Sequence, residues 1–183
     1  MAAHLVETRR GGVGACRAGG VSIMGEPTQP IADVAARYFR EGHNCAQAVL
    51  RAVAEAEGLA CPLCIPGVAL AMGGGIGHTG RACGAMTGAV MVVGLAADRL
   101  LAGPMPAKKR PAYRLAGGLV SRFAARFGSA DCEAILGLKW SEPDAMDRFR
   151  REGFMETKCV PCVRWAAEEA QHLVADMRAG KPM

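Results

Sequence analysis

Residues 44–58 read NCAQAVLRAVAEAEG, and this stretch indicates the fold class most clearly. Asn44 is a favoured N-cap residue, and Gly58 is a common helix stop. Between them, apolar residues recur every three or four positions, which is the spacing of one helix face. These residues are Cys45, Ala48, Val49, Ala52, Val53 and Ala56. We therefore predict a helix that buries one face and places Cys45 at its first position.

Similar periodicity recurs along most of the chain. It predicts helices from Ile31 to Gly42, near Gly67–Met72, from Cys83 onward, over 112–127 after a proline-containing loop, in a short turn between Ser129 and Gly137, from Glu142 to Glu152, and after a cap at Thr157. The apolar residues, 51% of the chain, are mainly alanine, leucine, valine and methionine, which helices accept. The prediction is an all-α fold, a compact bundle of about six to seven helices, forming one domain over residues 30–179.

Residues 1–29 differ from the rest of the sequence. They are rich in glycine and polar residues, lack apolar periodicity, and end in a proline-containing stretch. This composition is typical of a disordered extension. We interpret Cys16, which lies in it, as incidental to the chemistry.

Charge and hydropathy exclude two classes of function. The 22 basic and 17 acidic residues are interspersed, and the basic stretch 108–110 lies among prolines, so we expect no nucleic acid partner. The longest apolar stretch, Gly84–Ala97, is shorter than the roughly 18 residues of a membrane-spanning helix. We expect no membrane insertion and, since no secretory signal is evident, a cytoplasmic location.

Eight cysteines are many for a chain in a reducing compartment. Four of them fall in the predicted first turn of four different helices: Cys45, Cys83, Cys132 and Cys159. The unpaired N–H groups and partial positive charge of a helix N-terminus stabilise a thiolate. The pattern therefore predicts four cysteines of lowered pKa, a form suited to binding metals or attacking disulfides.

Four converging thiolates would repel one another unless a cation or protons offset their charge. An iron–sulfur cluster satisfies this requirement, and zinc satisfies it equally well on charge alone. Two reversible disulfides need no metal, and buried structural cysteines need no chemistry at all. The residues alone leave these alternatives open.

Two CxxC pairs add further candidates, Cys61/Cys64 and Cys159/Cys162. A thioredoxin-like site needs a βαβ unit, which the predicted helices do not provide, and a zinc ribbon needs two pairs much closer in sequence. We therefore retain Cys61, Cys64 and Cys162 as additional ligand candidates.

The glycine-rich stretch 73–80 reads GGGIGHTG and precedes Cys83. It matches a dinucleotide-binding pattern formally, but a helix and not a strand precedes it, which excludes that interpretation. We expect a tight turn beside the cysteine site, with His78 as a further candidate ligand. The glycines expected to support the site are Gly74, Gly75, Gly77, Gly84 and Gly88.

Several motifs together resemble one known family. They are GHNCAQAV (42–49), GGGIG (73–77), CGAMTG (83–88), FGSADC (127–132) and KC (158–159). The chain resembles the C_GCAxxG_C_C family of redox-active proteins over about Ile31–Met177. The resemblance implies that Cys45, Cys83, Cys132 and Cys159 are the functional cysteines, and a related domain in split-Soret cytochrome c favours an iron–sulfur cluster. This chain adds Cys61, Cys64 and Cys162 to the family pattern, and it lacks the CxxCH motif of c-type haem attachment.

The sequence therefore predicts a redox-active protein in which these four cysteines bind an iron–sulfur cluster for electron transfer. The alternatives are a thiol/disulfide oxidoreductase and a protein that binds zinc or another soft metal without redox activity. The sequence assigns no catalytic residue and no enzymatic reaction. We expect a redox partner protein, and the ten methionines favour a homodimer that covers apolar surface.

Overall fold

The computed structural model describes residues 29–60 and 64–181. Residues 1–28, including Cys16, and Cys61 lie outside the described residues. The described residues confirm the all-α prediction, since they form seven α-helices and two helical segments of other types, without a strand. The α-helices are α1 (Ile31–Arg40), α2 (Cys45–Ala56), α3 (Gly84–Leu100), α4 (Met105–Phe127), α5 (Cys132–Leu136), α6 (Ala145–Arg151) and α7 (Val160–Arg178). The two other segments are the 3₁₀ helix η1 (Gly67–Met72) and the π-helical turn η2 (Met155–Cys159).

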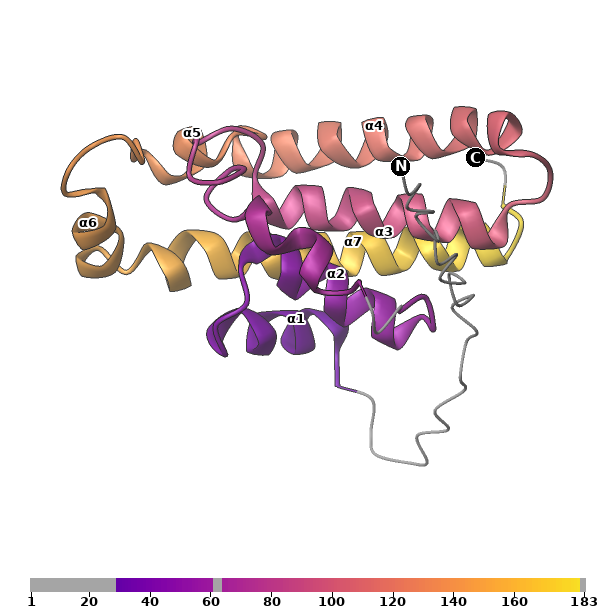
Figure 1. Cartoon of the computed structure of the whole chain (residues 1–183), viewed down its shortest axis with the longest axis horizontal. Helices are drawn as coiled ribbons and strands as arrows, with labels where there is room; N and C mark the ends of the chain where they lie inside the picture. The colour runs from indigo at the N-terminus through magenta and orange to yellow at the C-terminus, as the bar shows by residue number, and fades with distance from the viewer. Residues whose placement is uncertain (1–28, 61–63, 182–183) are drawn as a thin grey trace, which may run out of the picture.

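Two long helices, α3 and α7, run side by side through the middle of the molecule (Figure 1). α1 and α2 pack on one side of this pair, and α4 runs along α3 on the other side. α5 and α6 lie at the same end of the molecule (Figure 1). Helices α2, α3 and α7 each contact the other two and so form one packed unit. Each of these helices carries or adjoins one of the predicted cysteines.

The core consists largely of alanine and valine. The face of α2 predicted to be buried is buried at Ala48, Val49, Ala52 and Val53. α3 is likewise the buried core helix predicted from Gly84–Ala97. None of the helices in the described part of the chain combines the length and apolar character needed to cross a bilayer.

The structure corrects the start of the long helix that we predicted at residue 112. α4 begins at Met105, with Pro106 in its first turn, where a missing N–H costs no helical hydrogen bond. Pro111 lies inside the helix, where it removes one such bond. The basic stretch 108–110 is therefore helical, whereas the sequence predicted a loop.

Two shorter helices also begin later than predicted. Asp131, and not Ser129, is the N-cap residue of α5, although the Ser129 hydroxyl accepts a hydrogen bond from the Asp131 N–H at 3.0 Å. Gly137 ends this helix as predicted, in the left-handed conformation. α6 begins at Ala145, three residues after the predicted start at Glu142.

Candidate redox site

Cys45 lies at the first position of α2, as predicted. Asn44 and Gln47 form a reciprocal capping box, in which the Asn44 side chain accepts from the Gln47 N–H at 2.9 Å and the Gln47 side chain accepts from the Asn44 N–H at 3.1 Å. The Asn44 amide also donates to the carbonyls of Ala69 and Leu70 at 3.0 and 2.8 Å. Asn44 thus fixes the start of α2 against η1 and sets the position of Cys45.

Cys83 and Cys132 are held together by backbone hydrogen bonds. Cys83 is the N-cap residue of α3, and Cys132 is the first residue of α5, which confirms both predicted positions. The Cys83 N–H donates to the Ala130 carbonyl at 2.8 Å, and the Cys132 N–H donates to the Arg81 carbonyl at 2.7 Å. These bonds fasten the beginning of α3 to the beginning of α5.

Cys159 does not lie at a helix N-terminus, and the predicted cap at Thr157 is wrong. After Gly153, which has a φ of +62°, the chain is helical from Phe154 through η2 into α7. The Thr157 hydroxyl donates to the Gly153 carbonyl at 3.0 Å, a bond of the helix interior. Cys159 is therefore the last residue of the π-helical turn, and Cys162 follows on α7.

The five cysteines of these segments converge. Their side chains line one enclosed cavity: Cys45, Cys83, Cys132, Cys159 and Cys162, with Ile135 and Leu136. The cavity measures about 10 Å³, which is close to the volume that one water-sized sphere needs. Within it, the Cys45 thiol lies against Cys159, and the Cys162 thiol lies against Cys83. The four predicted cysteines are thus brought together, and the additional candidate Cys162 joins them.

The Cys83 sulfur is the member of this group that favours a negative charge. The Cys162 thiol donates toward it, and the N–H groups of Ala85 and Met86 lie near it, although neither reaches full capping geometry. Together these donors outweigh burial and lower the pKa of Cys83. The Cys162 thiol is the largest cause, and the N–H groups at the helix N-terminus contribute in the predicted direction.

The pKa values of Cys45, Cys162 and Cys132 shift in the opposite direction. The pKa of Cys45 is raised well above its usual value, first by its contact with Cys159 and then by desolvation. Donation to Cys83 and desolvation raise the pKa of Cys162. Burial raises the pKa of Cys132 to about 12. We predicted that a helix N-terminus would lower the pKa of Cys45 and Cys132. Burial in the cavity and the neighbouring thiols outweigh that effect and raise both pKa values.

The glycine-rich turn lies beside the cysteine cavity, as predicted. A Cβ atom on Gly75 would lie 2.6 Å from the Arg81 carbonyl oxygen and 2.7 Å from the Cys132 Cβ, and its φ is +71°. Only glycine lets the turn approach this closely. Gly74 and Gly77 hold the same turn at positive φ.

The two predicted glycines of α3 bring this helix close to α2. A Cβ atom on Gly84 would lie 3.1 Å from the Cys45 Cβ, and one on Gly88 would lie 2.6 Å from the Ala46 carbonyl oxygen. The close approach predicted from their spacing is thus confirmed, and it places the α2 cysteine beside the beginning of α3.

Two additional candidates are not brought to the cavity. Cys64 is exposed and lines a separate apolar cavity with residues of α2 and α3. His78 is also exposed, and its ring stacks on Trp140 with the centroids 4.6 Å apart. The structure therefore places neither residue among the sulfur atoms of the cavity.

Sequence reasoning missed Trp140, which packs with Cys132 in a small apolar cluster. Its indole N–H is buried, lies near the Cys132 sulfur and lowers the pKa of that thiol, but it has no hydrogen-bond partner of standard geometry among the described residues. Trp140 follows α5 in a loop, so no helical periodicity marks it. The one sequence signal is its position eight residues after a candidate cysteine.

The cysteine side chains suit a soft metal group by type and by position. Cysteine sulfurs are the ligands of iron–sulfur clusters and of closed zinc sites. The buried Trp140 N–H beside Cys132 also suits a negatively charged sulfur. As the side chains stand, no three His, Cys, Asp or Glu residues in the described ranges have the geometry of a formed metal site. Binding would require the thiols to lose their protons and the small cavity to widen.

Comparison with known proteins identifies a family. A family described as "Putative redox-active protein (C_GCAxxG_C_C)" matches residues 43–173, a range that includes all five cysteines of the cavity. No curated protein and no solved structure matches the chain.

Proposed function

The chain belongs to the C_GCAxxG_C_C family of redox-active proteins, and from this membership we propose that it transfers electrons through an iron–sulfur cluster held at the cysteine cavity. The observation that carries the proposal is the convergence of sulfur atoms from α2, α3, α5 and η2 on one enclosed point. Cys45, Cys83, Cys132 and Cys159 would hold the cluster. When bound, such a cluster accepts and releases single electrons.

The surrounding residues support this role. Ile135 and Leu136 line the cavity and add apolar surface beside the sulfurs. The N–H groups near Cys83 favour its deprotonated form, which is the form that binds metal. Hydrogen bonds to sulfur and exclusion of solvent are two determinants of a cluster's reduction potential.

Trp140 supplies a further donor. Its buried indole N–H has no hydrogen-bond partner of standard geometry in the part of the chain that the structure describes, which is costly unless the group faces an acceptor. A Cys132 thiolate would be that acceptor, because the two side chains already lie close together. We propose that a partner redox protein exchanges electrons with this site, since the site itself holds no substrate-sized cavity.

Iron and acid-labile sulfide analysis of anaerobically purified protein tests the proposal. We expect iron and sulfide in the wild type and their loss in single Ser variants of Cys45, Cys83, Cys132 and Cys159. Cys64→Ser is the matched control, because Cys64 lies in a separate cavity, and it should retain both. Zinc without sulfide, or equal iron in all variants, would overturn the proposal.

The paired cysteine contacts favour a second candidate, thiol/disulfide exchange. The Cys83 thiolate would attack a disulfide substrate, and one substrate sulfur would leave as a thiolate that takes up a proton. Cys162 would then lose its proton and attack the Cys83 sulfur, which releases the second substrate thiol. The protein ends with a Cys83–Cys162 disulfide, and two electrons have passed to the substrate.

Mass spectrometry separates the two candidates. Metal-free protein treated with a low-molecular-mass disulfide should lose about two daltons per disulfide formed, with Cys83 and Cys162 linked in the peptide map. The same linkage should be absent in Cys162→Ser. Protein whose cysteines form only mixed disulfides, with no internal linkage, would contradict this second candidate.

A further inference from the structure

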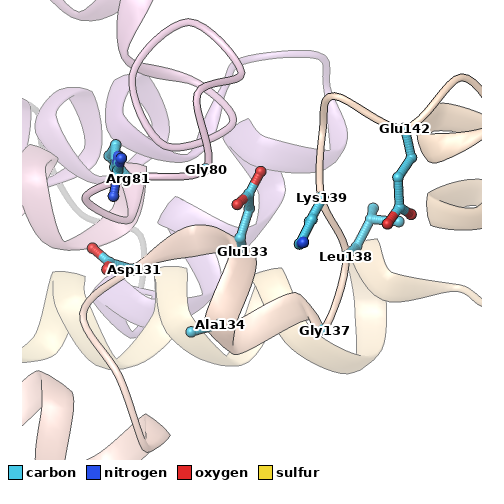
Figure 2. A pocket seen from close by; sticks show the side chains of 9 residues that line it. All are labelled: Gly80, Arg81, Asp131, Glu133, Ala134, Gly137, Leu138, Lys139 and Glu142. Carbon is cyan, nitrogen blue, oxygen red and sulfur yellow. The ribbon is translucent and has the colours of Figure 1, made fainter.

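Figure 2 shows the lining of a second cavity, which has a volume of about 420 Å³. The residues of α5 that line it differ from those that line the cysteine cavity. The volume of the second cavity lies within the range of small-molecule binding sites. Its lining comes from the end of the glycine-rich turn, from α5 and from the loop that follows α5: Gly80, Arg81, Asp131, Glu133, Ala134, Gly137, Leu138, Lys139 and Glu142.

The two cavities share α5 as a wall. One side of this helix supplies Cys132, Ile135 and Leu136 to the cysteine cavity. The other side supplies Glu133, Ala134 and Gly137 to the open pocket. The Cys132 and Glu133 N–H groups donate to the carbonyls of Arg81 and Gly80, at 2.7 and 3.0 Å. The floor of the pocket is therefore built from the same backbone that carries Cys132.

The pocket holds charges that the protein does not neutralise itself. Within residues 29–60 and 64–181, the side chains of Arg81, Lys139 and Asp131 take part in no hydrogen bond or ion pair. Glu142 differs, because it pairs with Arg148 at 2.8 Å. Two cationic side chains and one carboxylate thus face the pocket without partners.

The Glu133 side chain is held in place by the backbone around it. Its carboxylate accepts a hydrogen bond from the Trp140 backbone N–H at 3.0 Å. A Cβ atom on Gly80 would lie 2.0 Å from the Glu133 side chain, so this glycine makes room for it. Figure 2 shows the Glu133 carboxylate between Arg81 and Lys139, and no ion pair joins it to either in the described part of the chain.

We propose that this pocket binds a small zwitterion of the α-amino acid class. Arg81 holds the ligand carboxylate, and the neighbouring Glu133 carboxylate holds its ammonium group. The two carboxylates of the lining would repel a ligand that carries only a negative charge. The guanidinium and ammonium groups of the lining would repel a ligand that carries only a positive charge. Only a ligand that carries both charges satisfies both sets of groups.

The remaining lining suits the rest of such a ligand. Ala134 is exposed and adds apolar surface on which an aliphatic side chain can lie. The proposal is independent of a metal or cluster, because no cysteine lines this pocket.

Calorimetric titration of the full chain with L-leucine tests the proposal. We expect saturable binding by L-leucine and none by L-leucinamide, which lacks the carboxylate, or by N-acetyl-L-leucine, which lacks the ammonium group. Arg81→Gln and Glu133→Gln should each weaken binding about tenfold or more, since each removes a charge-assisted contact. Arg81 is exposed, so its substitution leaves the fold intact.

Arg114→Gln is the matched control, because Arg114 is an exposed arginine on α4 outside the pocket, and this variant should bind L-leucine like the wild type. Absence of saturable binding by L-leucine would overturn the proposal. Equal binding of N-acetyl-L-leucine or L-leucinamide would overturn it as well, because the site would then recognise a single charge. Wild-type affinity of the Arg81→Gln variant for L-leucine would also overturn the proposal.

Discussion

Cys83 differs from the other cysteines of the cavity in what surrounds its sulfur. The Cys162 thiol is the largest influence that lowers its pKa, and the N–H groups at the start of α3 add to it. Cys132 has a comparable burial but lacks these donors, and its pKa rises to about 12. The position of a few hydrogen-bond donors therefore decides which thiol loses its proton most readily.

This assignment predicts the pH dependence of cysteine alkylation in metal-free protein. A lowered pKa means that the thiolate forms at lower pH, so the reactivity of Cys83 should rise at lower pH than that of Cys132. Cys162→Ala removes a donor, raises the pKa of Cys83 and should move the Cys83 profile to higher pH. Peptide mapping after alkylation across a pH series measures both profiles.

Cys64→Ala serves as the control for this experiment, because Cys64 lines a separate cavity and its loss should leave the Cys83 profile unchanged. If Cys132 reacted at lower pH than Cys83, or if Cys162→Ala left the Cys83 profile in place, the described hydrogen bonding would be wrong.

Capping chemistry explains which site residues were predictable from the sequence. Asn44, Gln47 and Cys45 interact within four residues of one another, so the start of α2 follows from local sequence. The contact of Cys162 with Cys83 joins α7 to α3, and the position of Trp140 beside Cys132 depends on a loop path. Tertiary packing determines these contacts, and no local sequence pattern predicts them.

The contact between α2 and α3 positions two of the cysteine-bearing segments, and it depends on Gly88. A Cβ atom at this position would meet the Ala46 backbone, which cannot move without shifting α2. We expect Gly88→Ala to lower the free energy of unfolding by about 1–3 kcal/mol, the usual cost of overpacking a core. Thermal or urea unfolding of the metal-free protein measures this change.

Gly94 provides a matched control in the same helix. A Cβ atom there meets nothing within 4 Å, so Gly94→Ala should raise the free energy of unfolding by about 0.5–1 kcal/mol through helix propensity. Equal effects of the two substitutions would contradict a close approach between α2 and α3.

The elements themselves were predictable to different degrees. Apolar periodicity located the helices because each buries one face. The predicted helix starts at α4 and η2 were wrong for a common reason. A proline can stand before a helix or in its first turn, and a threonine can cap a helix or bond to a carbonyl inside one, so neither residue fixes the helix start. The neighbouring helices, and not the local residues, select between these states.

At the scale of the whole molecule, the proposed cluster would join α2, α3, α5 and η2. A ligand that binds only the folded chain stabilises it by mass action. We therefore expect reconstitution with iron and sulfide to raise the thermal unfolding temperature, and a chelator that removes the iron to reverse the increase. Differential scanning calorimetry under anaerobic conditions measures both, and an unchanged unfolding temperature in iron-loaded protein would contradict the shared site.

The homodimer expected from the sequence remains a prediction. Val68 and Leu70 of η1 are large apolar side chains with exposed fractions of 62% and 70%. A second copy would remove this surface from water. Sedimentation equilibrium should show a dimer of the wild type and a shift toward monomer in Leu70→Ser, whereas a monomeric wild type would contradict the prediction.

The central claim, that the converging cysteines form one electron-carrying centre, is tested most directly by spectroscopy of the wild-type protein. Anaerobically purified, iron-replete protein is measured by visible absorption and electron paramagnetic resonance before and after chemical reduction. The account predicts sulfur-to-iron charge-transfer absorption that weakens on reduction, together with a change in the paramagnetic signal. A colourless protein whose spectra do not change on reduction would contradict it.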